Sequence, residues 1–365
     1  MNTVMRILQC IPSMLNGGAQ RQLTYLAAEQ VRRGWAVHVA LLYDGPNFDR
    51  LKASGACVHR LSGRSNYDPR LLWQLIRVIR QVKPDVVQTW INQMDVFGGV
   101  AARLTSVPWV LSERTSAPAY PSTLKNRLRA LLAVGANAVV SNSAGGDAYW
   151  ASRLPARTRR YVIPNAVPLD EIAQAQPIST DEVGLEPARK MVLYVGRLSP
   201  EKNLENLIPA LRQAAERVPL TAYLCGDGTH RAWAEQLIEA HGASGCVHLI
   251  GYRPDVWNWM KAADLFISVS LFEGNPNTVL EAMACNCPLV VSDIPEHREF
   301  LNEQCAQFVN PYAPDEIAEA VLRVFVDPET TAHRIRQART RVAQWGSVPN
   351  MACQYERVYQ DIILR

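Results

Sequence analysis

Short apolar runs alternate with amphipathic helical patterns along most of this 365-residue chain. The run "VMRILQCIP" precedes the helical pattern "AQRQLTYLAAEQVRRG", and the runs "AVHVALLY" and "DVVQTW" follow with further helices between them. These runs show little polar alternation, which is typical of strands buried on both faces of a parallel sheet. The order therefore predicts an α/β fold in which helices cover both sides of parallel strands.

The length of the chain and one break in this alternation predict two domains. In "RRYVIPNAVPLDEIAQAQPIST" Pro164, Pro168 and Pro177 fall close together, and the alternation resumes at "KMVLYVGRL". We predict a first doubly wound domain over residues 1–165 and a second over residues 166–349. A C-terminal helix over residues 350–365 could return to the first domain.

The composition is that of a globular protein, with 48% hydrophobic and 20% charged residues. No apolar run reaches the roughly 18 residues of a membrane-spanning helix, and the N-terminus shows no signal-peptide pattern. The eight cysteines lack the spacing of a zinc site, so we expect reduced thiols in a cytoplasmic protein. A formal charge of +4 does not call for a nucleic-acid partner.

Ligands of doubly wound sheets bind beside the carboxyl ends of the strands, so the loops after strands are the expected functional positions. One such loop, "VGRLSPEKN", places Arg197 and Lys202 after a buried strand. Two cations there can hold a diphosphate, Arg through its planar fork and Lys as a point charge. The alternative is that both are solvated residues of a charged loop.

A second loop, "FEGNPNTVLEAM", carries the carboxylates Glu273 and Glu281. Pro276 favours a helix start, where free backbone N–H groups around Thr278 and Val279 would face an anion. Glu273 follows a buried strand and is a good acceptor for sugar hydroxyls. The letters "TVLE" also fit a capping box, in which Glu281 would only satisfy a backbone donor. Cations and carboxylates together predict a nucleotide-sugar site.

The stretch "FEGNPNTVLEAMACNCPLVVSD" resembles the E-x7-E signature of the family 4 retaining glycosyltransferases. The loop "VGRLSPEKN" resembles the R-x4-K loop of that family, and "GGAQRQL", "SNS", "IPNAV" and "GYRPDV" fall in the family's order. The resemblance covers nearly the whole chain and is stronger in the second half. It implies the GT-B architecture, in which two doubly wound, Rossmann-like domains face a cleft.

The resemblance implies a role for each of these positions. Arg197, Lys202 and Glu273 would be the catalytic set, with the two cations on the diphosphate and Glu273 near the donor sugar. Glu281 would hold the ribose hydroxyls. The remaining nucleotide contacts would be Tyr252, Arg253, Asn277, Thr278 and Val279.

The resemblance also implies an acceptor side in the first domain. Gly17 and Gly18 would form a glycine loop facing the cleft, for which the alternative is an ordinary strand-to-helix turn. Glu113 and Arg114 end a strand in "LSERTSAP", a stretch similar to one in members that extend lipid-linked oligosaccharides in bacteria. We expect this pair to face the cleft, and the alternative is a surface ion pair.

The first domain departs from the family pattern in its histidines. Many members carry a histidine there that faces the donor sugar, whereas this domain has only His38 and His59. Both fall within strand patterns, so we expect core or surface histidines without a role at the donor.

The expected chemistry needs no metal. Cleavage of a glycosyl–phosphate bond puts negative charge on the departing diphosphate, which Arg197, Lys202 and the helix N-terminus would stabilise. No Asp-x-Asp motif follows a predicted strand, so we expect neither a metal ion nor another cofactor. The resemblance implies retention by same-face attack, with the departing phosphate helping to deprotonate the acceptor.

We therefore expect a retaining hexosyltransferase acting in surface polysaccharide, lipopolysaccharide or oligosaccharide synthesis. It would move a sugar from a nucleotide-diphosphate sugar, with UDP-sugars foremost, to a glycan or lipid-linked acceptor. One alternative is a nucleotide-sugar epimerase of the same architecture, for which the first domain offers no histidine acid or base. Another is a catalytically silent donor-binding subunit, against which the complete set of charged site residues speaks.

Basic residues gather on two predicted amphipathic helices of the first domain. Such helices are either solvated faces or surfaces that rest on an anionic membrane. A lipid-linked acceptor would favour peripheral contact with the inner face of the cytoplasmic membrane. The residues are Arg70, Arg77, Arg80, Lys83, Lys125, Arg127 and Arg129.

Overall fold

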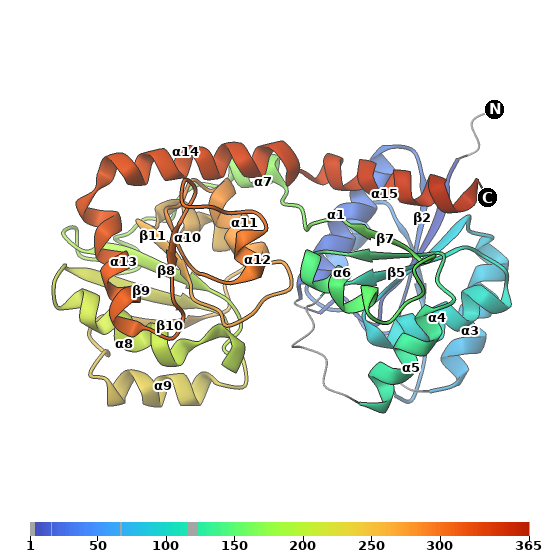
Figure 1. Ribbon diagram of the computed structural model, residues 1–365, viewed down its shortest axis with the longest axis horizontal. Helices are drawn as coiled ribbons and strands as arrows, with labels where there is room; N and C mark the ends of the chain where they lie inside the picture. The colour runs from blue at the N-terminus through green and yellow to red at the C-terminus, as the bar shows by residue number, and fades with distance from the viewer. Residues whose placement is uncertain (1–3, 16, 66–67, 115–122, 365) are drawn as a thin grey trace. The chain divides into compact units, whose positions relative to one another are not determined.

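The computed structural model describes residues 4–15, 17–65, 68–114 and 123–364. The chain divides into two compact units, Met1–Ala166 with Val348–Arg365, and Val167–Ser347. Each unit is built around one parallel sheet with helices on both faces (Figure 1). The predicted fold class, two doubly wound Rossmann-like sheets, is confirmed.

The first unit contains a seven-stranded parallel sheet in the order β3-β2-β1-β4-β5-β6-β7. Its strands are β1 (Arg6–Cys10), β2 (Ala36–Leu41), β3 (Cys57–Arg60), β4 (Val86–Trp90), β5 (Trp109–Glu113), β6 (Ala138–Ser141) and β7 (Arg159–Val162). Its helices are α1 (Gly18–Arg32), α2 (Phe48–Ala53), α3 (Arg70–Val82), α4 (Asn92–Leu104), α5 (Leu124–Ala133), α6 (Ala144–Ala151) and α15 (Val348–Ile363).

Two apolar cores lie on the two faces of this sheet. Alternate residues of β2 point into different cores. Val37 and Val39 pack in the core beneath α1 and α15, whereas Ala40 packs in the core beneath α3 and α4. This period of two explains why the strands read as almost continuous apolar runs, since both faces are covered.

The second unit contains a six-stranded parallel sheet in the order β10-β9-β8-β11-β12-β13. Its strands are β8 (Lys190–Val195), β9 (Leu220–Cys225), β10 (Val247–Gly251), β11 (Leu265–Ser268), β12 (Leu289–Ser292) and β13 (Gln307–Val309). Its helices are α7 (Leu169–Gln174), the 3₁₀ turn η2 (Pro200–Lys202), α8 (Leu204–Ala215), α9 (Arg231–Ala240), α10 (Val256–Ala262), α11 (Asn277–Ala284), α12 (Pro295–Arg298), α13 (Pro314–Val326) and α14 (Pro328–Trp345).

The strand order of each sheet reverses direction at one point. In the first unit the reversal lies between β1 and β4, and in the second it lies between β8 and β11. Crossover connections leave such a pair of strands toward opposite sides, which opens a crevice at their carboxyl ends where ligands bind. The topology therefore marks one candidate position in each unit.

Within the described residues, no helix combines the length and the apolar character that crossing a membrane requires.

Candidate functional site

Two of the predicted site loops flank the reversal point of the second sheet. The loop after β8 carries Arg197 and Lys202, and the loop after β11 carries Glu273. Because β8 and β11 are paired neighbours, their carboxyl ends bring these two loops together. The topology thus unites residues that lie about 70 positions apart, as the 71-residue separation of Lys202 and Glu273 shows.

Asn203 fixes the position of the loop after β8. It is buried, adopts a left-handed conformation with φ of 60°, and donates from Nδ2 to the carbonyl oxygens of Val269 at 3.0 Å and Pro311 at 2.7 Å. Asn tolerates this conformation better than most residues. The side chain therefore ties the end of η2 to the segments that follow β11 and β13.

A backbone hydrogen bond joins the two site loops directly. The N–H of Leu271 donates to the carbonyl oxygen of Glu201 at 2.9 Å. With the loops held in this way, Lys202 Nζ forms an ion pair with Glu273 Oε1, and the two side chains are only 18% and 11% exposed. Both residues were predicted from the sequence, and the structure shows that they contact each other.

The electrostatics of this pair keep Glu273 ionised. Burial acts to raise the pKa of Glu273, but the nearby Lys202 ammonium outweighs it and holds that pKa below its ordinary value. The carboxylate is therefore a hydrogen-bond acceptor at neutral pH, as contact with sugar hydroxyls would require. A phosphate approaching Lys202 would compete with Glu273 for the same ammonium.

Arg197 lies on the same loop and is exposed. The buried phenol of Tyr194 donates to the Arg197 carbonyl oxygen at 3.0 Å, which fixes the main chain beneath the guanidinium. Among the residues that the structure describes, none forms an ion pair with Arg197. A guanidinium held only by its backbone can turn its planar fork to an incoming phosphate.

Glycines allow the loops after β8 and β9 to meet. Gly226 adopts φ of 147°, and a Cβ built on it would lie 1.8 Å from the carbonyl oxygen of Gly196. The N–H of Leu198 donates to the carbonyl oxygen of Asp227 at 3.0 Å in the same region. Only glycine fits at position 226, because any side chain there would overlap backbone atoms. The floor of the candidate site is therefore tightly packed backbone.

Helix α11 begins at Asn277, as Pro276 led us to expect, with Pro276 at its N-cap and no side-chain cap. Thr278 is therefore the second helical residue and Glu281 the fifth. A capping box requires the Thr at the N-cap, so the alternative that Glu281 only caps the helix is wrong. The first-turn N–H groups of Asn277, Thr278 and Val279 lie at the end of α11 that favours an anion.

Glu281 is buried, with 1% of its surface exposed. Trp257 Nε1 donates to Glu281 Oε2 at 3.2 Å, a contact between α10 and α11 that the sequence analysis did not anticipate. This bond fixes one carboxylate oxygen, which would orient the group toward the ribose hydroxyls assigned to it. The ribose role itself stays a prediction.

Tyr252 and Arg253 follow β10, the edge strand two positions from β8. Tyr252 is 57% exposed, and the Arg253 guanidinium lies 5.2 Å from the centre of the Trp259 ring. Both side chains are therefore further from the reversal point than the charged pair is. That position suits the predicted contact with the base, which is the end of the nucleotide opposite the phosphates.

His297 is a completely buried residue of α12 that the sequence analysis missed. Its Nδ1 lies 2.8 Å from the carbonyl oxygen of Ser292, so Nδ1 must donate and the neutral ring carries its lone pair on Nε2. Burial lowers the pKa of His297. Within the described chain, Nε2 has no hydrogen-bond partner. The charges of Glu273 and Lys202 act on this ring, so it lies near the site. Its only sequence signal is its place after the strand that ends in "SD".

In the first unit, Gly17 and Gly18 lie after β1 at the start of α1. Gly17 has an extended backbone with φ of −159°, so its conformation does not require glycine. A Cβ on Gly17 would meet Oε1 of Gln20 at 2.3 Å, which a flexible side chain can avoid by turning away. The structure thus places these glycines beside the reversal point, and their acceptor role stays a prediction.

Glu113 ends β5 as predicted, but its side chain is fully buried. Its Oε2 accepts hydrogen bonds from Arg129 Nη1 and Trp150 Nε1, both at 2.9 Å, and its Oε1 accepts from the backbone N–H of Arg114 at 2.8 Å. This carboxylate is therefore not accessible to an acceptor, contrary to our expectation. The alternative of a surface ion pair with Arg114 is also wrong, because the partner of Glu113 is Arg129.

Arg129 belongs to a buried network rather than to a basic surface. It is 2% exposed, and its Nε donates to Asp95 Oδ2 at 2.7 Å while Nη1 holds Glu113. Asp95 Oδ1 accepts from Thr89 Oγ1 at 2.6 Å. Burial raises the pKa of Asp95 to about 6. The expectation that Arg129 lies on a membrane-facing surface is therefore wrong.

Arg114 is half-buried against aromatic rings. Its guanidinium lies 4.2 Å from the centre of the Trp90 ring, and Nη1 donates to Asn165 Oδ1 at 3.1 Å. Nη2 donates to the hydroxyl of Tyr355 on α15. These contacts tie the end of β5 to α15. The loop after Arg114, in which "TSAP" falls, lies outside the described residues.

The backbone beside the first reversal point is strained at Ile91, which follows β4 with φ of 72°. A β-branched residue rarely adopts positive φ, and strain of this kind costs about 1–3 kcal/mol. Strained backbone is concentrated at functional sites. The sequence "QTWINQ" gave no sign of it.

Two family models match the chain. The model described as Glycosyltransferase Family 4 matches residues 16–171, and the one described as Glycosyl transferases group 1 matches residues 176–341. Together they cover most of both units. The chain therefore contains a Glycosyltransferase Family 4 domain followed by a Glycosyl transferases group 1 domain, as the resemblance implied.

Sequence relatives agree with this assignment. A glycosyltransferase of Methanocaldococcus jannaschii, MJ1607, is 30% identical over 181 residues, which are 49% of this chain and 46% of that protein. A second one, MJ1059, is matched over 34% of its length, so the chain matches less than half of either protein. The UDP-Gal:alpha-D-GlcNAc-diphosphoundecaprenol alpha-1,3-galactosyltransferase of Escherichia coli is 23% identical over 313 residues, or 81% of this chain and 80% of that protein.

Solved structures share the fold. Anabaena Alr3699/HepE in complex with UDP-glucose is 22% identical and has a TM-score of 0.86, covering 98% of this chain and 100% of that one. A glycosyltransferase from Rickettsia africae is 16% identical with a TM-score of 0.83, covering 99% of both chains. At these identities the likeness establishes the GT-B fold class.

Proposed function

We propose that this glycosyltransferase transfers a sugar, with retention of configuration, from a UDP-sugar to a lipid-linked or glycan acceptor in surface polysaccharide or oligosaccharide synthesis. The observation that carries the proposal is the Lys202–Glu273 ion pair at the reversal point of the second sheet. Arg197 and the N-terminus of α11 belong to the same group of loops. One site thus combines cations for a diphosphate with a carboxylate for sugar hydroxyls.

The leaving group decides what these residues do. As the bond between the anomeric carbon and the phosphate oxygen breaks, negative charge grows on the diphosphate. Lys202 and Arg197 would stabilise that charge without a metal ion, and the α11 N–H groups would add to it. Glu273, freed from Lys202 when the diphosphate binds, would accept hydrogen bonds from the donor sugar. Glu281, held by Trp257, would accept hydrogen bonds from the ribose.

The relatives support the choice of donor and acceptor. The Escherichia coli relative is named for UDP-Gal and a diphosphoundecaprenol-linked sugar. A Campylobacter jejuni relative, 30% identical over 132 residues, is named as an N-acetylgalactosaminyltransferase acting on a diphospho-undecaprenol substrate. Anabaena Alr3699/HepE is described with UDP, glucose and UDP-glucose bound. We extend these chemistries to this chain as its donor and acceptor classes.

We assign the acceptor to the first unit, beside the reversal point between β1 and β4. Gly17 and Gly18 start α1 there, and the half-buried guanidinium of Arg114 follows β5. A diphosphate-linked acceptor carries negative charge, which a guanidinium can accept in a bidentate manner. Glu113 has no part in this assignment because its carboxylate is buried.

We further propose that α5 rests on an anionic membrane surface. Its exposed side includes Leu124, Leu128 and Leu131, with 82%, 43% and 70% of their surfaces accessible, together with exposed Lys125 and Arg127. Apolar residues flanked by basic ones are typical of helices that lie in the headgroup region of a membrane. This contact would bring the enzyme to a lipid-linked acceptor.

Vesicle sedimentation tests the membrane proposal. Wild type should sediment with phosphatidylglycerol vesicles and remain in solution with phosphatidylcholine vesicles. The double variant Leu124→Gln/Leu131→Gln should lose most of the binding, whereas the control Val326→Gln, which changes an exposed apolar residue of the second unit, should keep it. Equal sedimentation of the double variant and the control would reject α5 as the membrane contact.

A turnover assay tests the proposed function and separates it from its alternatives. The protein is incubated with UDP-glucose, UDP-galactose or UDP-N-acetylglucosamine and a bacterial lipid extract. We expect UDP release that depends on the extract, together with a glycosylated lipid. An epimerase would convert the sugar without releasing UDP, and a silent subunit would bind UDP without turnover. Either result would contradict the proposal. Lys202→Ala provides the inactive control.

A further inference from the structure

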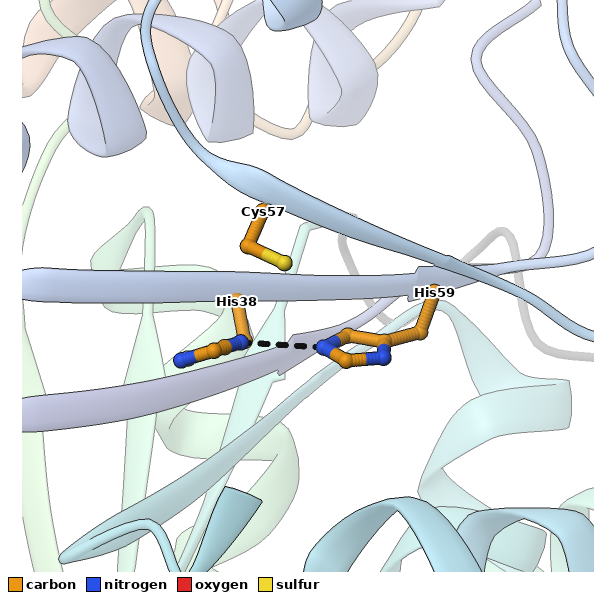
Figure 2. Close-up of side chains that lie close together, drawn as sticks. All are labelled: His38, Cys57 and His59. Atoms are coloured by element: carbon orange, nitrogen blue, oxygen red, sulfur yellow. Dashed lines mark hydrogen bonds between the residues drawn. The ribbon is translucent and has the colours of Figure 1, made fainter. Parts of the chain in front are cut away.

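Three potential metal ligands meet at the edge of the first sheet, on strands β2 and β3. His38, Cys57 and His59 each offer one ligand atom, and these atoms all lie within 4.8 Å of one another. Figure 2 shows the two rings side by side, joined by a contact of 2.9 Å between His38 Nδ1 and His59 Nε2, with the Cys57 sulfur directed toward them. The donor set is two imidazoles and one thiol.

The strand register brings these residues together. His38 of β2 is the direct partner of Cys57 of β3, and Ala40 is the partner of His59. Cys57 and His59 are two residues apart, so their side chains leave the same face of β3. The three side chains therefore share one face of the sheet, and the regular strands β2 and β3 hold them there.

The cluster is separate from the candidate site. β3 is the edge strand of the first sheet, and all three ligands lie within β2 and β3 rather than on the loops that follow these strands. The site residues of the first unit follow the carboxyl ends of β1 and β5. The proposed transfer reaction makes no use of the three ligands.

The surroundings let an ion reach neutral ligands. Cys57 is exposed and both histidines are half-buried, so solvent has access. Burial lowers the pKa of His59, and it also lowers the pKa of His38, to which the charges of His59 and Arg6 contribute. An ordinary imidazole is mostly neutral near pH 7, so each ring offers a lone pair to a metal ion. The Arg6 guanidinium is the charge that opposes a cation here.

We propose that His38, Cys57 and His59 form a binding site for a borderline transition-metal ion of the Zn²⁺ class. Imidazole and thiolate are the donors that Zn²⁺ and Co²⁺ accept, whereas Mg²⁺ and Ca²⁺ select oxygen. Zn–N bonds of about 2.0–2.1 Å in a tetrahedral site separate two ligand nitrogens by about 3.3 Å. The two nitrogens would have to separate by a few tenths of an ångström. The rings would also have to turn so that their lone pairs converge on the ion, and the Cys57 sulfur would have to approach them, since the three atoms now lie up to 4.8 Å apart.

When the ion binds, metal–ligand bonds replace bonds between the ligand atoms and protons. The Cys57 S–H bond breaks, the sulfur bonds the metal as thiolate, and the proton passes to solvent. The ring that donates the shared proton loses it from the facing nitrogen and takes up a proton from solvent on its outer nitrogen. Both facing nitrogens can then bond the metal, and each neutral ring carries one N–H on its outer nitrogen. Three protein ligands leave a fourth position open to water. The ion would cross-link β3 to β2 and stabilise an exposed edge strand.

Metal titration of the full-length, reduced protein tests the site. Calorimetry with Zn²⁺ should give one strong site per chain. The observed binding enthalpy should change with the ionisation enthalpy of the buffer, because the protein releases protons when the ion binds. With Co²⁺ as a spectroscopic probe, a thiolate-to-cobalt charge-transfer band should appear and saturate at one equivalent. Zn²⁺ should also raise the melting temperature of wild type, because it binds the folded state.

Variants at the three ligands and matched controls decide the result. Cys57→Ser and His59→Gln should each weaken Zn²⁺ binding at least about tenfold, since even loss of a supporting residue costs that much. Cys57→Ser should abolish the cobalt charge-transfer band. The controls Cys353→Ser, at a half-buried cysteine, and His248→Gln, at an exposed strand histidine, should bind as wild type does.

Two results would overturn the proposal. One is equal Zn²⁺ affinity in wild type and Cys57→Ser, which would place the ion elsewhere. The other is wild-type protein that shows no thiolate–cobalt band at saturating Co²⁺. The second measurement needs no variant, so it decides the question even if a substitution prevents folding.

Discussion

The reversal points of the two sheets share one topology but differ in how their charges are placed. In the second unit, Lys202 and Glu273 are partly accessible on loops, and Arg197 is exposed beside them. In the first unit, Asp95, Glu113 and Arg129 are sealed inside, with side-chain exposures of 0%, 0% and 2%. The accessible charges of the second unit can bind a substrate, whereas the three buried charges of the first unit neutralise one another and hold the fold.

A residue's place after a strand does not by itself predict function. Glu113 and Glu273 both lie at the carboxyl end of a central strand. Glu113 is the last strand residue, and its side chain turns inward to Arg129, whereas Glu273 lies five residues beyond β11 on a loop. Distance from the end of the strand therefore separates the structural carboxylate from the candidate ligand.

The largest expected effect is a loss of stability when the buried network of Asp95, Glu113 and Arg129, here called the sealed network, is broken. Arg129→Met should destabilise the protein by about 3–5 kcal/mol, because it leaves two buried carboxylates without their cation. Chemical denaturation monitored by circular dichroism measures this loss. The control Arg127→Met changes an exposed arginine of the same helix and should cost little. Equal stability of the two variants would show that the network does not hold the fold.

The next effect is on turnover and comes from the accessible pair. Lys202→Ala and Arg197→Ala should each raise the transfer barrier by about 2–4 kcal/mol, since each removes a cation that stabilises the departing diphosphate. Steady-state kinetics at saturating donor and acceptor measure this change. Melting temperatures should stay near that of wild type. Near-normal turnover in either variant would remove that residue from the diphosphate clamp.

A third effect is a pH dependence that belongs only to the sealed network. The pKa of Asp95 is about 6 when folded, against an ordinary value of 3.8, so the folded state holds its proton more strongly. This contribution to stability is complete below about pH 4 and is lost as the pH rises through about 6, by up to about 3 kcal/mol. Melting curves of wild type and Asp95→Asn between pH 4 and 7 measure it. The stability of wild type relative to Asp95→Asn should fall as pH rises, and a constant difference would contradict the assignment.

The smallest expected effect concerns Glu281, which is buried like Glu113 but assigned to the donor. Glu281→Gln keeps one acceptor oxygen for Trp257 and loses a charge-assisted contact with ribose. Donor affinity should fall by about 1–2 kcal/mol while the melting temperature barely changes. Calorimetric titration with UDP measures the affinity. If Glu281→Gln binds UDP as tightly as wild type, Glu281 has a structural role, as Glu113 does.

The sequence was sufficient for the fold class because it depends on local patterns, whereas the roles of the site residues stay predictions. Apolar runs alternating with helices predicted parallel sheets, and the start of α11 was visible at Pro276. The capping-box alternative failed because Pro276 is the N-cap, which places Thr278 inside the helix. The Lys202–Glu273 contact could not be derived, since it depends on the pairing of β8 with β11.

What the sequence could not predict are contacts between distant elements. Arg129 lies in a basic helical pattern that favours an exposed face, yet it packs against Asp95 and Glu113, 34 and 16 residues away. His38 and His59 looked like isolated strand residues until the register of β2 with β3 paired them. In each case a long-range pairing overrides the local pattern.

Calorimetric titration with UDP and with UMP tests most directly whether the accessible charges of the second unit hold the donor diphosphate. Wild type should bind UDP more tightly than UMP, because UMP lacks the second phosphate. In the double variant Arg197→Ala/Lys202→Ala most of this preference should be lost. Arg129→Met, measured at a temperature where it is folded, should keep the wild-type preference. A wild-type preference for UDP that survives in the double variant would contradict the account.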